Sequence, residues 1–131
     1  MLSPASTVRD AVDRMDVYQF PALVILTDLR EVVAVITEGD VARAVSKRDS
    51  LSELAGEPAL TYATRDPFTL PPDTEVSDAL HAMLSRGITI LPVVEEEQLI
   101  GICLRMDLMQ AILVDMQMAK DQRDGDRPRT V

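Results

Sequence analysis

The chain has 131 residues, of which 47% are hydrophobic, enough for one compact core but not for two independent ones. Its 13 basic and 22 acidic residues give a net charge of −9, which opposes binding to nucleic acid or to anionic lipid. No apolar run approaches the ~20 residues of a membrane span, and the first residues lack the basic-then-apolar order of a signal peptide. The composition therefore predicts a cytoplasmic protein with no nucleic-acid or membrane partner.

The first part of the chain predicts a helix, two strands and a second helix. Apolar residues recur at helical spacing over residues 8–15, and Thr7 lies near the N-cap position. Continuous apolar runs at residues 22–26 and 32–36 predict a hairpin that is buried on both faces. Residues 40–47 predict the closing helix.

A connecting segment follows at residues 49–61. Ser50 and Glu53 have the spacing of a helix-capping box, and Gly56 can end that short helix. Residues 62–70 then predict an extended strand that leads into the second part of the chain. We expect residues 68–70 of this lead-in to pair with the sheet of the opposite half, with no equally long counterpart before Pro4.

The second part repeats the order of the first. It predicts a helix over residues 76–84 with Thr74 near its N-cap, strands over residues 88–94 and 99–104, and a helix over residues 107–120. The tail, residues 121–131, is polar and contains Gly125 and Pro128, so we expect it to be disordered.

An internal repeat explains this order. At an offset of 68 residues five identities fall in one short stretch. They are Pro4 and Pro72, Val8 and Val76, Asp10 and Asp78, Ala11 and Ala79, and Met15 and Met83. One residue drops out in the hairpin turn, after which Asp40 aligns with Asp107 and Ala44 with Ala111. The repeat predicts two copies of one α-β-β-α unit, residues 1–48 and residues 62–120.

These copies resemble the CBS domain, a family that occurs as tandem pairs called Bateman modules. The runs VAVITEGD (residues 33–40) and IGICLRMD (residues 100–107) are similar to the family's apolar strand, Thr or Ser, two residues, and Asp. The segments LPVV (91–94) and RDP (65–67) extend the match, which covers residues 3–116. The resemblance implies an α/β (α+β) fold of two half-domains related by a pseudo-twofold axis, with a lead-in strand on the second copy.

The resemblance also implies a regulatory sensor. In CBS pairs, clefts between the copies bind adenosine compounds such as AMP, ADP, ATP or S-adenosylmethionine. The Asp and Thr of one copy act there with the lead-in strand and hairpin of the other. The residues that this implies for the first cleft are Thr37, Asp40, Ala63, Thr64, Arg65, Pro67, Phe68 and Ile88. Arg65 would neutralise a phosphate, although a lone arginine in an acidic chain also serves as a surface ion-pair partner.

The pattern Thr37-x-x-Asp40 has two interpretations on its own chemistry. It is a helix-capping pattern that satisfies free amide groups at a helix start. The same helix start, with its N–H groups and hydroxyl, favours a phosphate, and its carboxylate can accept the hydroxyls of a ribose. In the second copy Asp107 remains while Leu104 replaces the threonine, so the reciprocal cap is lost and the carboxylate is kept. One competent site, at Thr37 and Asp40, is the prediction.

The sequence offers few residues suited to catalysis or metal binding, so we do not expect an enzyme. The chain has no nucleophile with an adjacent base and no glycine-rich phosphate loop. Cys103, the only cysteine, lies in an apolar run and is expected in the core. His81, the only histidine, is expected on a helix surface.

The last helix carries a second apolar stripe. Leu108, Ala111, Ile112 and Ala119 form one stripe that faces the core. Met109, Leu113 and Met116 form another that a monomer would expose, which predicts a homodimer. Two functions remain open: a module that binds an adenosine compound and signals to a regulated protein, or a ligand-free platform for dimerisation and protein interaction.

Overall fold

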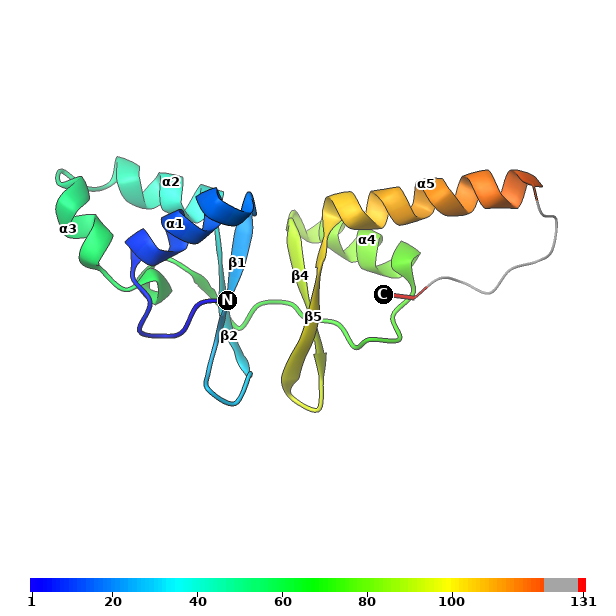
Figure 1. The fold of residues 1–131 in the computed structure, drawn as a ribbon, viewed down its shortest axis with the longest axis horizontal. Helices are drawn as coiled ribbons and strands as arrows, with labels where there is room; N and C mark the ends of the chain where they lie inside the picture. The colour runs from blue at the N-terminus through cyan, green and yellow to red at the C-terminus, as the bar shows by residue number, and fades with distance from the viewer. Residues whose placement is uncertain (122–129) are drawn as a thin grey trace. The chain divides into compact units, whose positions relative to one another are not determined.

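The computed structural model describes residues 1–121 and 130–131, which form two compact units, Met1–Pro67 and Phe68–Val131 (Figure 1). Each unit contains one copy of the repeat. In each, the helices gather at one end of a hairpin whose turn points away from them (Figure 1). The α-β-β-α order is therefore confirmed in both copies.

The first unit has a three-stranded antiparallel sheet in the order β1-β2-β3. Its elements are α1 (Val8–Tyr18), β1 (Ala22–Leu26), β2 (Val32–Thr37), α2 (Glu38–Ser46), α3 (Leu51–Gly56), a 3-10 turn η1 (Ala59–Thr61) and β3 (Thr64–Arg65). All five residues of β1 are buried, as expected for a strand covered on both faces. Helix α1 packs Ala11 and Met15 against Leu23, Ile25 and Ile36 of this sheet.

The second unit is built on a two-stranded hairpin. Its elements are α4 (Val76–Arg86), β4 (Ile90–Glu95), β5 (Gln98–Leu104) and α5 (Arg105–Asp121). Ala79, Met83, Leu91 and Leu108 are its buried centre. His81 is exposed on α4, as expected. Cys103 was expected in the core but is only partly buried, and it packs against the edge of this cluster.

The lead-in strand is shorter than predicted and pairs at different residues. Thr64 and Arg65, not residues 68–70, pair with β2 of the first copy. Leu70 instead bridges Val93 within its own copy. Asp66 has a left-handed backbone (φ 48°), which breaks the extended run between these two contacts.

The first copy also has a counterpart of Leu70, although it is a single bridge and not an equally long lead-in. Leu2 bridges Ile25 as Leu70 bridges Val93, and both pairs are 68 residues apart (70 − 2 and 93 − 25). The Leu2 N–H donates to the carbonyl of Val24 at 3.1 Å. Within the residues described, β4 and β5 form a two-stranded sheet, without a third strand that corresponds to β3.

The connecting segment is part of the first unit's fold. Ser50 caps α3 by accepting from the Glu53 N–H at 3.3 Å, which is one half of the predicted capping box. Leu54 and Ala59 of this segment are buried. Of the tail expected to be disordered, residues 122–129 lie outside the described residues, whereas Thr130 forms a β-bridge with Glu75. The predicted boundaries between copies and linker remain predictions.

The two copies differ in how their first helices are capped. Thr7 is the N-cap of α1: its hydroxyl accepts from the Asp10 N–H at 3.2 Å, and the Asp10 carboxylate accepts from the Thr7 N–H at 2.9 Å. In the second copy the N-cap is Glu75, without a side-chain cap, and Thr74 lies one residue earlier. Thr74 therefore lies near the N-cap, as predicted, but does not cap α4.

This difference predicts unequal effects of two matched substitutions. Thr7→Ala removes a capping hydroxyl and should lower the free energy of unfolding by about 1 kcal/mol. Thr74→Ala removes only a hydroxyl that donates to the Pro71 carbonyl and should cost less. Urea unfolding followed by circular dichroism measures both. Equal losses of unfolding free energy in the two variants would show that the capping box of Thr7 does not stabilise α1.

Candidate functional site

The candidate site is the turn where β2 passes directly into α2. Thr37 ends β2 and is the N-cap of α2, so the free N–H groups of the helix start lie beside its hydroxyl. Gly39 follows in the first turn, where an added Cβ would lie 3.3 Å from Nη1 of Arg43. The absence of a side chain at this position leaves room for Arg43 beside the helix start.

Asp40 is the buried polar residue of this turn, with 8% of its surface exposed. Its Oδ2 accepts from the Thr37 N–H at 2.9 Å, and its backbone N–H donates to the Thr37 hydroxyl at 3.0 Å. Its Oδ1 forms an ion pair with Nη2 of Arg43. The capping interpretation of Thr37 and Asp40 is thus realised in the structure, and both carboxylate oxygens already have partners.

The same pattern at Thr7 and Asp10 provides an internal comparison. Both helices begin with Thr-x-x-Asp and both form the full reciprocal box. Asp10 is exposed, whereas Asp40 is buried and has Arg43 as a further partner. Capping alone requires only what Asp10 has, so the burial of Asp40 and its arginine are what distinguish the candidate site.

Sequence reasoning missed Arg43, although the signal was present. Asp40 and Arg43 are three residues apart on a helix, the spacing at which side chains meet. The Arg43 side chain is 65% exposed, so it can leave the carboxylate without unpacking a core.

The lead-in strand lies beside this turn in the same unit. Thr64 pairs with Val35 and Arg65 with Ala34 on β2, and both lead-in side chains are exposed. Ala63 packs against the core of the first unit, on the side of Thr64 that runs towards Thr37. Pro67 is partly buried at the end of the unit. The first unit therefore contains Thr37 and Asp40 at the β2–α2 turn, and Ala63, Thr64 and Arg65 on the lead-in that pairs with β2 just before this turn.

A polar cluster fixes the start of the lead-in. The Tyr62 hydroxyl donates to Oε2 of Glu57 and accepts from Arg48 at 3.0 and 3.2 Å, while Arg48 also forms an ion pair with Glu57. The hydrogen bond from Tyr62, followed by that from Arg48, lowers the pKa of Glu57. The cluster joins the end of α2 to the residue before Ala63 and thereby positions β3.

The remaining predicted residues belong to the second unit. The guanidinium of Arg86 lies 3.8 Å from the ring centroid of Phe68, and both Phe68 and Ile88 pack against the second unit's core. Asp107 is exposed in the first turn of α5, where a carboxylate favours the helix dipole. Burial, and then the charge of Asp107, raises the pKa of the Cys103 thiol. The predicted roles of Phe68, Ile88 and Asp107 in ligand binding remain predictions.

A comparison with protein families agrees with the internal repeat, and the part that it matches includes the β2–α2 turn. The CBS domain model matches residues 1–47 and 59–114, one match in each copy. The chain belongs to the CBS domain family. It is a CBS-pair regulatory module, and no helix among residues 1–121 and 130–131 is long and apolar enough to cross a bilayer.

Relatives carry the same pair in different settings. The chain is 35% identical over 114 residues to an uncharacterized 17.7 kDa protein of Acidianus ambivalens, covering 86% of this chain and 66% of that protein. It is 30% identical over 113 residues to arabinose 5-phosphate isomerase of Yersinia pestis, covering 86% of this chain but 34% of the isomerase. The pair therefore spans less than two thirds of these relatives.

Solved structures share the fold. CBSX2, crystallised in complex with AMP, has a TM-score of 0.78 at 24% identity, with 88% of each chain covered. The CBS-domain protein ATU1752 of Agrobacterium tumefaciens has a TM-score of 0.77 at 18% identity, with 86% of this chain and 87% of that chain covered. At these identities the likeness establishes the fold.

The polar cluster of Arg48, Glu57 and Tyr62 predicts a specific dependence of stability on pH. Because the folded-state pKa of Glu57 is lowered, its contribution is complete above about 4.5 and is lost as the pH falls through the lower folded-state value. Tyr62→Phe removes the main cause of that shift. The difference in urea midpoint between wild type and Tyr62→Phe should therefore shrink as the pH falls from about 6 to about 3.

The chain's other tyrosine provides the control. Tyr18 is exposed and stacks on Phe20, so Tyr18→Phe should show no comparable change with pH. A difference between wild type and Tyr62→Phe that stays constant over the whole range would contradict the role given to the hydrogen bond.

Proposed function

We propose that this CBS pair binds an adenosine compound at the β2–α2 turn and passes the resulting conformational signal to a partner protein. The observation that carries the proposal is the buried Asp40 carboxylate at the start of α2, directly after the strand with which the exposed residues of β3 pair. A protein of the same fold, CBSX2, has been crystallised with AMP, which supports this ligand class.

Each group at the turn has a chemical role in this proposal. Asp40 would accept the ribose hydroxyls through Oδ1, after Arg43 has moved away from it. The Thr37 hydroxyl and the α2 N–H groups would face a phosphate, as helix starts favour anions. Arg65, exposed on β3, and the released Arg43 would neutralise the phosphate charge.

The first test is calorimetric titration with AMP. Asp40→Ala should abolish binding, because hydrogen bonds to a charged carboxylate contribute about 1.5–3 kcal/mol each. Asp107→Ala should change binding little. Asp10→Ala is the matched control, since it removes the same capping box from an exposed position in the same unit. Equal loss in all three variants would contradict the assignment of the site to Asp40.

Folding of the Asp40 variants is controlled by a second substitution. Asp40→Asn keeps an oxygen that can accept from the Thr37 N–H but removes the charge that pairs with Arg43. It should melt close to wild type and still bind AMP weakly. No binding by the wild-type chain to AMP, ADP, ATP or S-adenosylmethionine would leave the interaction platform as the function.

We also propose that the chain forms a homodimer through α5. The apolar stripe predicted from the sequence is exposed in the structure: Met109 by 46%, Leu113 by 56% and Met116 by 64%. Hiding such a surface contributes roughly 25 cal/mol per Å² of apolar area, and salt screens the repulsion between two acidic chains.

Leu113→Glu should therefore produce a monomer in sedimentation velocity while keeping its helical circular dichroism, because it buries a charge in the contact. Leu51→Glu is the control, since Leu51 is a similarly exposed leucine (62%) on α3. A Leu113→Glu chain that stays dimeric would show that α5 is not in the interface.

A further inference from the structure

The start of α4 is held by a segment that is far from it in the sequence. Thr130 forms an antiparallel bridge with Glu75, and the Val131 N–H donates to the Thr74 carbonyl at 2.7 Å. Figure 1 shows residues 130–131, in red, beside the green segment that leads into α4. We call these two residues the strap. Val131 is partly buried and packs against the core cluster of the second unit.

The first unit contains the same pair of contacts at the start of α1. Thr7 forms an antiparallel bridge with Pro58, and the Ala59 N–H donates to the Ser6 carbonyl at 2.9 Å. At the 68-residue offset of the repeat, Ser6 and Thr7 align with the two residues that hold the strap. The strap therefore occupies in the second unit the place that Pro58 and Ala59 occupy in the first.

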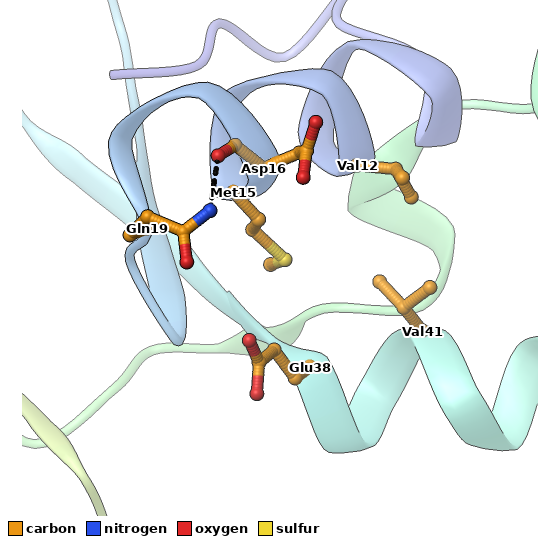
Figure 2. Close-up of a pocket in the computed structure, with 6 residues that line it drawn as sticks. All are labelled: Val12, Met15, Asp16, Gln19, Glu38 and Val41. Atoms are coloured by element: carbon orange, nitrogen blue, oxygen red, sulfur yellow. Dashed lines mark hydrogen bonds between the residues drawn. The ribbon is translucent and has the colours of Figure 1, made fainter.

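The core clusters of the two units agree with this correspondence. In each unit an alanine and a methionine of the first helix are buried with a leucine of the first strand: Ala11, Met15 and Leu23, and Ala79, Met83 and Leu91. Figure 2 shows Met15 pointing away from α1 into the hollow between α1 and α2. Ala59 is fully buried in the first cluster, and Val131 packs against the second. The strap thus adds one apolar side chain to the core of its unit, as the connecting segment does.

The strap is held at fewer points than the connecting segment. The Glu57 side chain forms an ion pair with Arg48, and the Glu57 carbonyl accepts from the Val8 N–H at 2.8 Å. In the described part of the chain, the strap has its bridge, its hydrogen bond and the partial burial of Val131. Helix α1 also has the capping box of Thr7, whereas α4 has no side-chain cap. The start of α4 therefore depends more on the strap than the start of α1 depends on the connecting segment.

We infer that the start of α4 is an intramolecular docking site for the strap, and that release of the strap loosens α4 while the first unit stays folded. The first N–H groups of a helix have no partner within the helix, so an uncapped start frays when its outside contacts are lost. Release also uncovers the part of the second unit's core that Val131 covers. Because each unit is compact by itself, the opening is confined to the second unit. The strap is thus a switch that acts on α4 alone.

Hydrogen exchange on the whole chain, read by mass spectrometry of peptides from α1 and α4, tests this switch. Val131→Asp places a charge against the apolar cluster. Exchange at the start of α4 should then become faster by about tenfold, because the burial of one valine side chain is lost. Exchange in α1 should stay at the wild-type rate. Val131→Ala is the matched control: it gives the strap the residue that the first unit has at Ala59, and it should raise exchange in α4 much less.

Two proline substitutions test the backbone contact separately. Thr130→Pro gives the strap the residue that the first unit has at Pro58, where the bridge to Thr7 is kept, so exchange in α4 should stay at the wild-type rate. Val131→Pro removes the N–H that donates to the Thr74 carbonyl, so exchange at the start of α4 should become several-fold faster.

Three results would overturn the inference. Wild-type exchange of α4 in both Val131→Asp and Val131→Pro would show that the strap does not hold this helix. Faster exchange of α1 and α4 together would show that the whole chain unfolds and that no local switch exists. Protection of α4 that rises with protein concentration in the wild type would show that the strap docks on a second copy and not within its own chain.

Discussion

The buried carboxylate of Asp40 is the constraint on which the functional half of this fold depends. A charge removed from water must find partners, and Asp40 finds them in the Thr37 N–H and in Arg43. These contacts fix the point at which a strand becomes a helix, directly after β2. The helix start is therefore presented in one defined orientation beside the lead-in strand, and the same contacts that stabilise the turn are those a ligand would exchange.

The lead-in strand depends on a second polar cluster rather than on a long ladder. Only Thr64 and Arg65 pair with β2, and two paired residues contribute little on their own. The cluster of Arg48, Glu57 and Tyr62 supplies the missing constraint by holding the chain immediately ahead of β3. Positioning of the candidate site thus combines hydrogen bonds to charged groups with the burial of Leu54 and Ala59, two residues of the connecting segment.

The two copies share one order of helices and strands but differ in the side chains at equivalent positions. The first keeps Thr37 as the N-cap of α2, and a hollow between α1 and α2 is lined in part by Asp16 and Glu38 (Figure 2). The second has leucine in place of the threonine, and it has Leu80 and Leu108 in place of Val12 and Val41, both of which pack in its core. Its closing helix is also longer, at 17 residues against nine for α2, and its additional turns carry exposed methionines.

The sequence by itself determined the repeat, the order of helices and strands, and the Thr-x-x-Asp pattern, because each depends on local spacing of apolar and capping residues. It also determined the exposed stripe of α5, since helical periodicity assigns faces without knowledge of packing. Only the tertiary structure decided that Asp40 is buried while Asp10, with the same local pattern, is exposed. The tertiary structure likewise decided that residues 64–65 form the paired lead-in, because a left-handed Asp66 ends the strand, and that Leu2 repeats the role of Leu70. Burial and strand partners depend on what distant segments place against a residue, and apolar spacing along one segment does not contain that information.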